Sequence, residues 1–524
     1  MTEAFYKPLS RLERAFVGLG FAGLAIFVLA TQTRNVGFAP DFHGLVSSHT
    51  LAIASHADST TGFVGYSIRR EDDAGKTDYD YFDRNPVFFS AGMNLLLKAA
   101  GPSPADKLYL ARQVMNVIFL ATLAVGFLLV RELTGDGLTA ASAAILTFSG
   151  SYFMFYKDMI HFEEPALLGL LLLLYAILRR HRGGSRAPLY VCALFAVSFG
   201  RGYVSLGLLA LWTAIEYGKA LLAEWPKPSA AAARWLKQDA IRVLTLATLL
   251  TAGYLVYNVA TEARVRGVSW AETSIINSGG RRLGYLPDQK TQFLSPWNRY
   301  LPITARRLAR LALPYAAVHM LLQKFDAERL HAALPLAASL AVLAAVFIAH
   351  LRAVATADRS FYVLLVLSGL PWLVLVRRHA TLDYTAIYFA GLLLVFYAAL
   401  CARVPVRLRG VALAVALAVF VASTAAVNAD RSAIAANDPY TPDFARMLGR
   451  LRPGDRIFVP GDYQQLLRRR PYALGFYLSR QSIAPLSRAD YALSDDRSFA
   501  PDNLTPGNEA VFLFSIPRDT ERRR

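Results

Sequence analysis

The sequence predicts an all-α polytopic membrane protein of about eleven transmembrane helices, with a small α/β lobe at its C-terminal end. Of its 524 residues 55% are hydrophobic and only 18% are charged, which is more apolar sequence than one soluble core needs. Long uncharged stretches alternate with short clusters of Lys and Arg. A chain built in this way is expected to cross a membrane many times.

Uncharged stretches of about the length of a bilayer core recur along the chain. They are 15–33, 113–130, 137–156, 165–178, 187–199, 202–215, 243–261, 330–351, 360–376, 384–402 and 410–429. Charged residues interrupt two pairs of them, at 157–164 and at 200–202. Such interruptions at membrane depth are tolerated where they face a cavity or water, so both are candidate functional segments.

The distribution of basic residues predicts the orientation. If the N-terminus is cytoplasmic, the Arg- and Lys-rich loops 179–186, 219–237 and 403–409 all lie in the cytoplasm. The loops 31–85 and 262–328 and the C-terminal lobe then share the outer face. Within the long outer loop, 303–324 is expected to form an amphipathic helix in the interface, because a crossing there would invert every later loop.

Two segments outside the spans have their own patterns. Residues 63–70 and 77–82 alternate around the polar run 71–76, which predicts a β-hairpin in the first outer loop. The transmembrane part is expected to occupy 1–430 and the lobe 437–524. In the lobe we predict strands at 456–459 and 510–516 and a helix at 463–479.

Composition also argues against several functions. The formal net charge of +18 comes from scattered loop clusters, so no nucleic-acid partner is expected. Cys192 and Cys401 both lie in apolar stretches, which argues against disulfides and cysteine metal sites. His43, His49 and His56 are too far apart for a compact metal motif, so no cofactor is expected and a divalent metal is not indicated.

Four motifs in order carry a family resemblance. They are Asn85-Pro86-Val87-Phe88-Phe89, then Tyr109–Gln113 opening a span that ends at 131–135, then Tyr156-Lys157-Asp158 followed by Glu163-Glu164, then Phe199-Gly200-Arg201-Gly202. Residues 15–217 resemble the GT-C class of membrane glycosyltransferases, in particular bacterial relatives of protein mannosyltransferases and aminoarabinose transferases. Asn85 stands where that family usually has His, and Arg201 where it usually has Lys.

The resemblance implies a GT-C-like fold and an enzyme that moves a sugar from a polyprenyl-phosphate donor to a lipid, glycan or protein acceptor. It implies transfer on the outer face of the cell inner (plasma) membrane, with inversion at the sugar carbon. Membrane lipids are the other expected partners, and the C-terminal lobe would be periplasmic or extracellular.

Carboxylates are the candidate catalytic groups, because such a transfer needs a base to take the acceptor proton. Asp41 resembles the family's first-loop aspartate in position and is the candidate base, although it could instead only cap a helix over 42–55. Glu163 and Glu164 are candidates for holding the acceptor or the sugar hydroxyls. The alternative is that both are solvated charges at a helix start.

Positive groups are the candidates for stabilising the leaving phosphate. On the expected outer face they are Lys157, Arg201, Arg377, Arg378 and His379. Charged groups at a membrane face can also act only as headgroup anchors. His43, Asp83 and Asn85 complete the candidate substrate site.

Two other classes remain open from the sequence. A lipid-linked oligosaccharide flippase or transporter would show paired half-repeats and polar residues in mid-span. A polymerase or ligase that moves a whole glycan from a lipid diphosphate could use basic residues of the loop 262–328.

Overall fold

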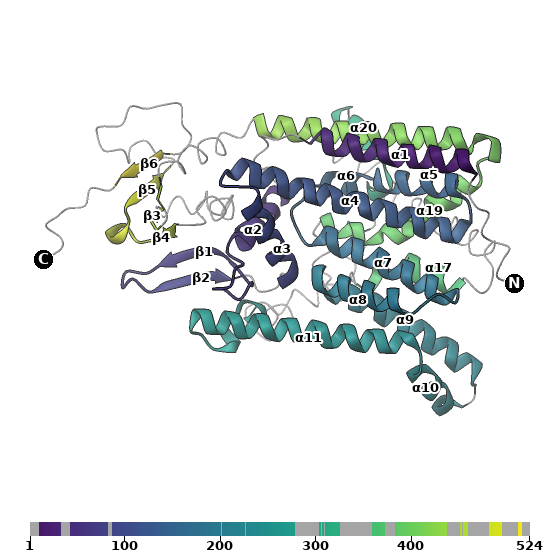
Figure 1. The fold of residues 1–524 in the computed structure, drawn as a ribbon, viewed down its shortest axis with the longest axis horizontal. Coiled ribbons are helices and arrows are strands. Elements are labelled where there is room, and N and C mark those ends of the chain that lie inside the picture. The colour runs from purple at the N-terminus through teal and green to yellow at the C-terminus, as the bar shows by residue number, and fades with distance from the viewer. Residues whose placement is uncertain are drawn as a thin grey trace, which may run out of the picture.

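The computed structural model describes a bundle of long helices with a mixed β-sheet at one end (Figure 1). The described residues are 10–32, 42–81, 86–200, 202–225, 227–277, 303–304, 307–308, 310–324, 359–371, 383–436, 451–452, 454–459, 481–494 and 512–515. The N-terminal helix starts at the end of the bundle opposite the sheet, so the sheet covers one end of the membrane helices.

The predicted spans coincide with helices wherever the structure describes them. The bundle helices are α1 Arg11–Ala30, α4 Pro104–Thr134, α5 Gly137–Phe148, α7 Glu163–His181, α8 Ala187–Phe199, α9 Gly202–Ala223, α11 Asp239–Arg266, α17 Arg359–Leu367, α19 Ala390–Ala402 and α20 Arg409–Ala436. Among the residues that the structure describes, six helices are long and apolar enough to cross a membrane. The chain is therefore a multi-pass membrane protein, and the predicted stretch 330–351 lies outside the described residues.

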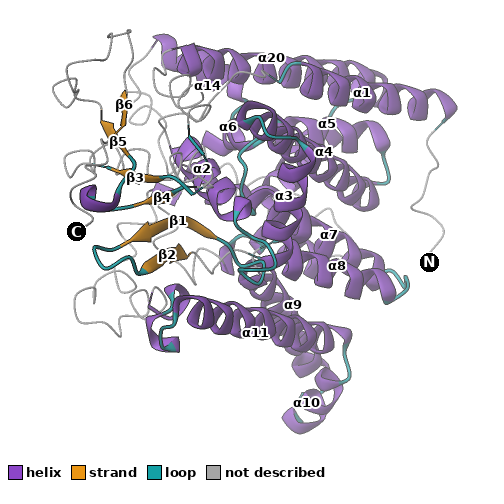
Figure 2. Cartoon of the chain, turned by 60° about the vertical axis from the view of Figure 1, so that its left-hand side comes forward, coloured by secondary structure: helices purple, strands orange, loops and turns teal. Residues whose placement is uncertain are grey.

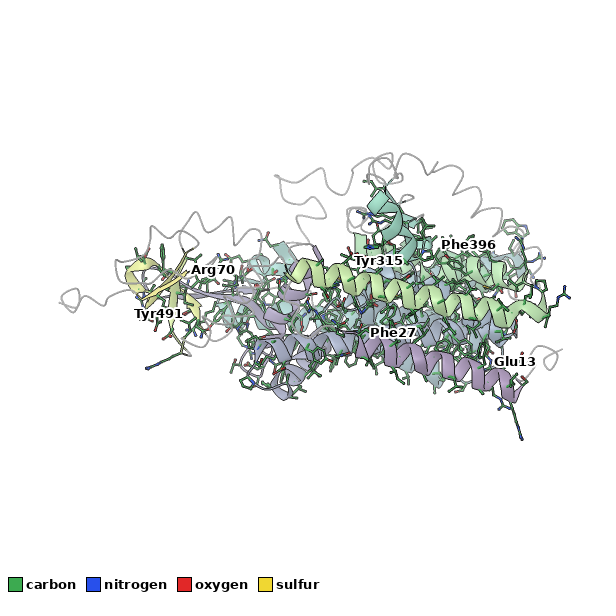
Figure 3. The ribbon with its side chains drawn as sticks, turned by 90° about the horizontal axis from the view of Figure 1, so that it is seen from above. Glu13, Phe27, Arg70, Tyr315, Phe396 and Tyr491 are labelled. Carbon is green, nitrogen blue, oxygen red and sulfur yellow. The ribbon has the colours of Figure 1, made fainter. Side chains whose placement is uncertain are left out.

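Local sequence signals set several helix ends. Ser10 and Glu13 form a capping box at the start of α1. Ser103 caps α4, which ends at Gly135 with a left-handed φ of 69°. α1 and α20 then run side by side along one edge of the bundle (Figure 3), where Asn428 donates to the Thr31 hydroxyl at 3.0 Å.

One predicted span is not continuous. The stretch 137–156 forms α5, which ends at Phe148, and a separate short helix α6 over Ser151–Tyr156. Between them Gly150 pairs with Pro314 in an isolated bridge, and a Cβ on Gly150 would lie 2.2 Å from the Leu311 carbonyl oxygen. The break depends on a segment more than 150 residues away, so the local hydrophobicity could not reveal it.

Two further helices lie between the bundle and the sheet (Figure 1). They are α2 Phe42–Ser55 and α3 Val87–Ala99, joined where the Asn94 amide donates to the Ala54 carbonyl at 2.7 Å. The helix predicted over 42–55 is thus confirmed. Its end is tied to the sheet because the His56 ring stacks on Tyr66, with centroids 4.1 Å apart.

The sheet joins two distant parts of the chain (Figure 2). Its strands are β1 Tyr66–Glu71, β2 Thr77–Tyr81, β3 Arg456–Phe458, β4 Ser482–Ile483, β5 Tyr491–Ser494 and β6 Phe512–Ser515, in the order β2-β1-β4-β3-β5-β6. β1 and β2 form the predicted hairpin, with Arg70 opposite Asp78. β1 also pairs in parallel with β4, so the hairpin segment 66–81 and the C-terminal segment share one sheet.

Two of the elements predicted in the C-terminal segment are present as strands. The strands expected at 456–459 and 510–516 correspond to β3 and β6, whereas the helix expected at 463–479 lies outside the described residues.

The other described helices are short. They are α10 Pro228–Leu236, α14 Tyr315–Lys324 and the 3-10 turns η1 Trp270–Glu272, η4 Asp383–Phe389, η5 Val406–Leu408 and η7 Leu486–Arg488. α14 has 10 residues, too few to span a bilayer, and packs against α20 and α6. In Figure 3 the label of Tyr315 marks the position of α14 beside α20. The Tyr315 hydroxyl donates a hydrogen bond to Asp430 at 2.6 Å.

Candidate functional site

Buried polar and charged side chains meet where several bundle helices end near α2 and the sheet. We call this group the polar cluster. Its members are Gln32, His43, Arg112, Asn116, Lys157, Asp158, Glu163, Glu164 and Arg431, and each has less than a tenth of its surface exposed. They come from the end of α1, from α2, α4 and α20, from the irregular segment between α6 and α7, and from the first turn of α7.

Asp158 is the centre of this cluster. Its Oδ1 lies 3.2 Å from Nη2 of Arg431 and 3.3 Å from Nε2 of His43. Its Oδ2 accepts a hydrogen bond of 3.4 Å from the Gln32 amide. The Arg431 guanidinium also donates to the Phe155 carbonyl and lies 5.0 Å from the Phe155 ring centroid. A buried carboxylate with this many donors is expected to be ionised.

Lys157 joins the cluster to α4. Its Nζ donates to the Asn116 side chain at 3.3 Å, and Asn116 in turn donates to Gln32 at 3.0 Å. Arg112 lies one helical turn before Asn116 on α4 and interacts electrostatically with Lys157. Arg431 and Lys157 therefore both act on the Asp158 carboxylate, and Arg112 is a third buried cation that lies within electrostatic reach of Lys157.

Glu163 and Glu164 occupy the first turn of α7, a position that favours acidic side chains. Both are fully buried, so the alternative that they are solvated surface charges is wrong. Glu163 accepts a hydrogen bond from the Tyr388 hydroxyl, and its Oε1 lies 4.0 Å from Nδ1 of His161. Neither carboxylate oxygen of Glu164 has a hydrogen-bond partner among the described residues.

The cluster has a cationic part and an acidic part. Arg112, Lys157 and Arg431 supply donors to an anion, whereas Glu163 and Glu164 supply acceptors to a hydroxyl or amine. Asp158 lies between the two parts, since it contacts Arg431 and also interacts electrostatically with Glu164. A substrate that carries both a phosphate and a hydroxyl could therefore be held from both sides.

The sequence-predicted residues divide into two groups. The structure brings His43 and Lys157 together through Asp158, and it places Glu163 and Glu164 at the start of the next helix. The other candidates lie outside the described residues: Asp41, Asp83, Asn85, Arg201, Arg377, Arg378 and His379. Asp41 immediately precedes α2 in the chain, and the second residue of α2 is His43.

Several members of the cluster were not predicted as site residues. Asp158 belongs to the same motif as Lys157, so its place next to a candidate residue was the sequence signal that could have identified it. Arg112 lay in the Tyr109–Gln113 motif that carried the family resemblance but was not chosen as a site residue, whereas no local pattern indicated the burial of Arg431 near the end of α20. Across the described part of the chain, no group of three His, Cys, Asp or Glu side chains could hold a metal ion.

No protein-family model and no curated protein matches the sequence. The helix bundle defines a multi-pass membrane protein, and comparison with solved structures shows a related fold. The chain is similar to the structure of ArnT from Cupriavidus metallidurans bound to undecaprenyl phosphate. That match has a TM-score of 0.56 and 11% identity, and it covers 90% of this chain and 86% of ArnT.

A second structure gives a weaker match. The oligosaccharyltransferase from Archaeoglobus fulgidus, in complex with Zn and sulfate, matches with a TM-score of 0.45 and 12% identity, over 91% of this chain and 68% of that one. The GT-C fold expected from the sequence is thus confirmed by the ArnT match. At 11% identity this likeness concerns the fold alone.

Proposed function

We propose that this protein is a GT-C-type glycosyltransferase that moves a sugar from a polyprenyl-phosphate donor to an acceptor at the sheet-bearing face of the membrane. The observation that supports this proposal best is the polar cluster. Ionisable side chains buried among membrane helices are costly, and they are retained mainly where they bind a substrate or an ion. A cluster with separate cationic and acidic parts suits a donor phosphate beside a nucleophilic acceptor.

The cationic part would hold the donor phosphate. Lys157, Arg112 and Arg431 offer ammonium and guanidinium donors, and guanidinium groups can bind two phosphate oxygens at once. Neutralising the phosphate as it leaves would lower the barrier to transfer. The similar ArnT structure contains undecaprenyl phosphate, which supports a lipid phosphate as the donor group.

The acidic part would receive the acceptor. In the proposed reaction Asp41 takes the proton of the acceptor hydroxyl or amine, whose oxygen or nitrogen then attacks the sugar C1. The C1–O bond breaks on the opposite face, and the lipid phosphate leaves with its electron pair, so the configuration inverts. Glu163 and Glu164 would hold the acceptor or sugar hydroxyls, and His43 would orient Asp158.

The candidates outside the described residues keep their proposed roles. Arg201, Arg377, Arg378 and His379 would add positive charge at the phosphate, and Asp83 and Asn85 would contact the sugar or acceptor. The proposed mechanism requires no metal or cofactor.

Charge asymmetry supports the proposed orientation in the inner membrane. The last turn of α7 carries Arg179, Arg180 and His181, and the same end of the bundle includes the basic turn η5. With that end cytoplasmic, the sheet and the polar cluster face outward. The transmembrane region would then occupy 1–430, and residues 437–524 would form the outer lobe together with the β1–β2 hairpin.

The test is transfer of label from radiolabelled polyprenyl-phosphate sugars in membranes that contain the full chain. We expect Asp41→Asn to reduce transfer by at least 100-fold, since general bases contribute about 10²–10⁴-fold. The matched control is Asp73→Asn, the same change at an exposed position of the hairpin turn. Glu164→Gln should also reduce transfer, whereas Glu224→Gln at the other end of the bundle should not.

Normal transfer by the Asp41→Asn variant would show that Asp41 is not the base. Transfer of a whole glycan from a lipid diphosphate, without transfer from monophosphate donors, would identify a ligase or polymerase instead. Movement of labelled lipid across the membrane without transfer would identify a flippase.

A further inference from the structure

A second charged site lies at the opposite end of the bundle from the polar cluster. It is a cleft between the C-terminal end of α7, the second half of α9 and the start of α11, and it encloses about 380 Å³. This volume lies within the usual range of small-ligand sites. We call it the basal cleft; the helices that line it, α7, α9 and α11, are labelled in Figure 1.

Positive charge exceeds negative charge around the basal cleft. Asp239 is bound by two arginines, with Arg180 Nε 2.6 Å from Oδ2 and Arg186 Nε 3.0 Å from Oδ1. Arg186 is exposed, and its contacts with Asp239 at 3.0 Å and 3.2 Å both involve Nε. Lys237 also lines the cleft, is exposed, and has no ion-pair partner among the described residues.

The neighbouring acidic groups do not cancel this excess. Glu216 lines the cleft but is paired with Lys219 at 2.7 Å. Glu132, nearby on α4, is shared by Arg179 at 3.3 Å and Arg182 at 3.6 Å. The carboxylates of Glu132 and Asp239 are thus each bound by two arginines, and the lining of the cleft keeps an excess of positive charge.

The interior of the basal cleft is apolar. Ile177 and Trp212 form its inner wall. A crevice of about 10 Å³, room for about one water molecule, lies beside these two residues between α9 and α17, and it is lined by Ile215, Phe361 and Leu364 together with the polar His181, Glu216 and Ser360. A ligand that enters from the charged mouth would therefore meet hydrocarbon side chains behind it.

The surroundings place the cleft mouth at a bilayer surface. Leu222, Trp225 and Leu236 are exposed around α10, with 83%, 74% and 59% of their surface accessible. Large apolar side chains next to Lys and Arg on a short helix are typical of segments that lie in the membrane interface. The cleft therefore opens where lipid headgroups are available.

We propose that the basal cleft binds an anionic bilayer phospholipid. The phosphodiester lies against Arg180, Arg186 and Lys237, and the first part of one acyl chain packs against Ile177 and Trp212. Basic pockets between membrane helices suit such headgroups, because the cation, the phosphate and the hydrocarbon are all matched. This inference is independent of the proposed transfer reaction, since none of these residues belongs to the polar cluster.

Native mass spectrometry of the full chain in detergent tests the assignment. The probes are phosphatidylglycerol and phosphatidylcholine with identical acyl chains, and inorganic phosphate as a separate arm. We expect retention of phosphatidylglycerol over phosphatidylcholine, and a loss of about fivefold in affinity for Lys237→Gln or Arg186→Gln. In both variants Asp239 keeps the Arg180 contact, so the fold should be preserved.

Arg407→Gln is the matched control, because Arg407 is an exposed basic residue of η5 at the same end of the bundle. It should bind phosphatidylglycerol as the wild type does. Equal retention of both lipids, or equal weakening by Arg407→Gln and Lys237→Gln, would overturn the proposal. Displacement of phosphatidylglycerol by millimolar inorganic phosphate would instead assign the cleft to free phosphate.

Discussion

Asp158→Asn isolates the electrostatic role of the residue at the centre of the polar cluster. The amide has nearly the same shape as the carboxylate but no charge, and its amino group cannot accept a hydrogen bond. Arg431 would keep the Phe155 carbonyl and ring as partners and lose its contact with the anion at 3.2 Å. The buried guanidinium would then be incompletely compensated.

The magnitude follows from the separation and the burial. Two unit charges 3.2 Å apart interact by about 5 kcal/mol at an effective dielectric constant of 20. Breaking a buried ion pair by removing one partner costs about 3–5 kcal/mol in measured cases. We therefore expect Asp158→Asn to lower the free energy of unfolding by about 3–5 kcal/mol. Arg431→Met should cost a similar amount.

The assay is a double-mutant cycle in detergent, with unfolding followed by circular dichroism. Because both partners are replaced, the double variant Asp158→Asn/Arg431→Met should recover at least about 2 kcal/mol of the summed loss. Asp78→Asn is the matched control. Asp78 also pairs with an arginine, Arg266, at 3.1 Å, but 64% of its side chain is exposed. A surface pair of this kind contributes about 1 kcal/mol or less.

Two results would refute this reasoning. Additive losses in the cycle would show that Asp158 and Arg431 are not coupled. A loss for Asp158→Asn no larger than that for Asp78→Asn would show that Asp158 is solvated.

Two further predictions concern packing and pH. A side chain at Gly169 of α7 would place its Cβ 2.8 Å from Ala196 of α8, so Gly169→Leu should cost about 1–3 kcal/mol in unfolding free energy, whereas Gly253→Leu, with open space around it, should not. Burial raises the pKa of Asp78, but the hydrogen bond and charge of Arg266 outweigh it and lower the pKa below the ordinary value. The stabilisation by the ionised Asp78 is therefore present above about pH 4 and is lost as the pH falls through the lowered pKa. The melting curves of the wild type and of Asp78→Asn should converge in acid. A difference between them that does not change with pH would contradict the pairing.

Much of the helical architecture could be predicted because it depends on local sequence. A bilayer core requires about 20 apolar residues per helix, so the ranges of α1, α4, α11 and α20 are visible as uncharged stretches. The β1–β2 hairpin was visible for a similar reason: exposed and less exposed side chains alternate along β2, and Gly75 supplies the positive φ of 83° in the turn.

The remaining features depend on contacts between distant residues. The sheet joins β1 to β4, where Ser482 donates to Glu71 at 2.9 Å across 411 residues of sequence. The site likewise depends on contacts between residues that are distant in the sequence. Lys157 and Glu163 were visible as charges at a span boundary, but no local pattern indicates that Arg431 reaches Asp158. For that reason the carboxylate between the cations was missed.

The central claim is that the cationic part of the polar cluster binds a lipid phosphate. The most direct measurement is the affinity of the purified full chain for undecaprenyl phosphate, compared between Lys157→Met and Lys98→Met. Both variants replace a lysine by a side chain of similar length, but Lys157 is buried in the cluster and Lys98 is exposed on α3. We expect Lys157→Met to weaken binding by about 10–100-fold, because a charge-assisted hydrogen bond contributes about 1.5–3 kcal/mol, and Lys98→Met to bind as the wild type does. Wild-type affinity in a folded Lys157→Met variant would contradict the account.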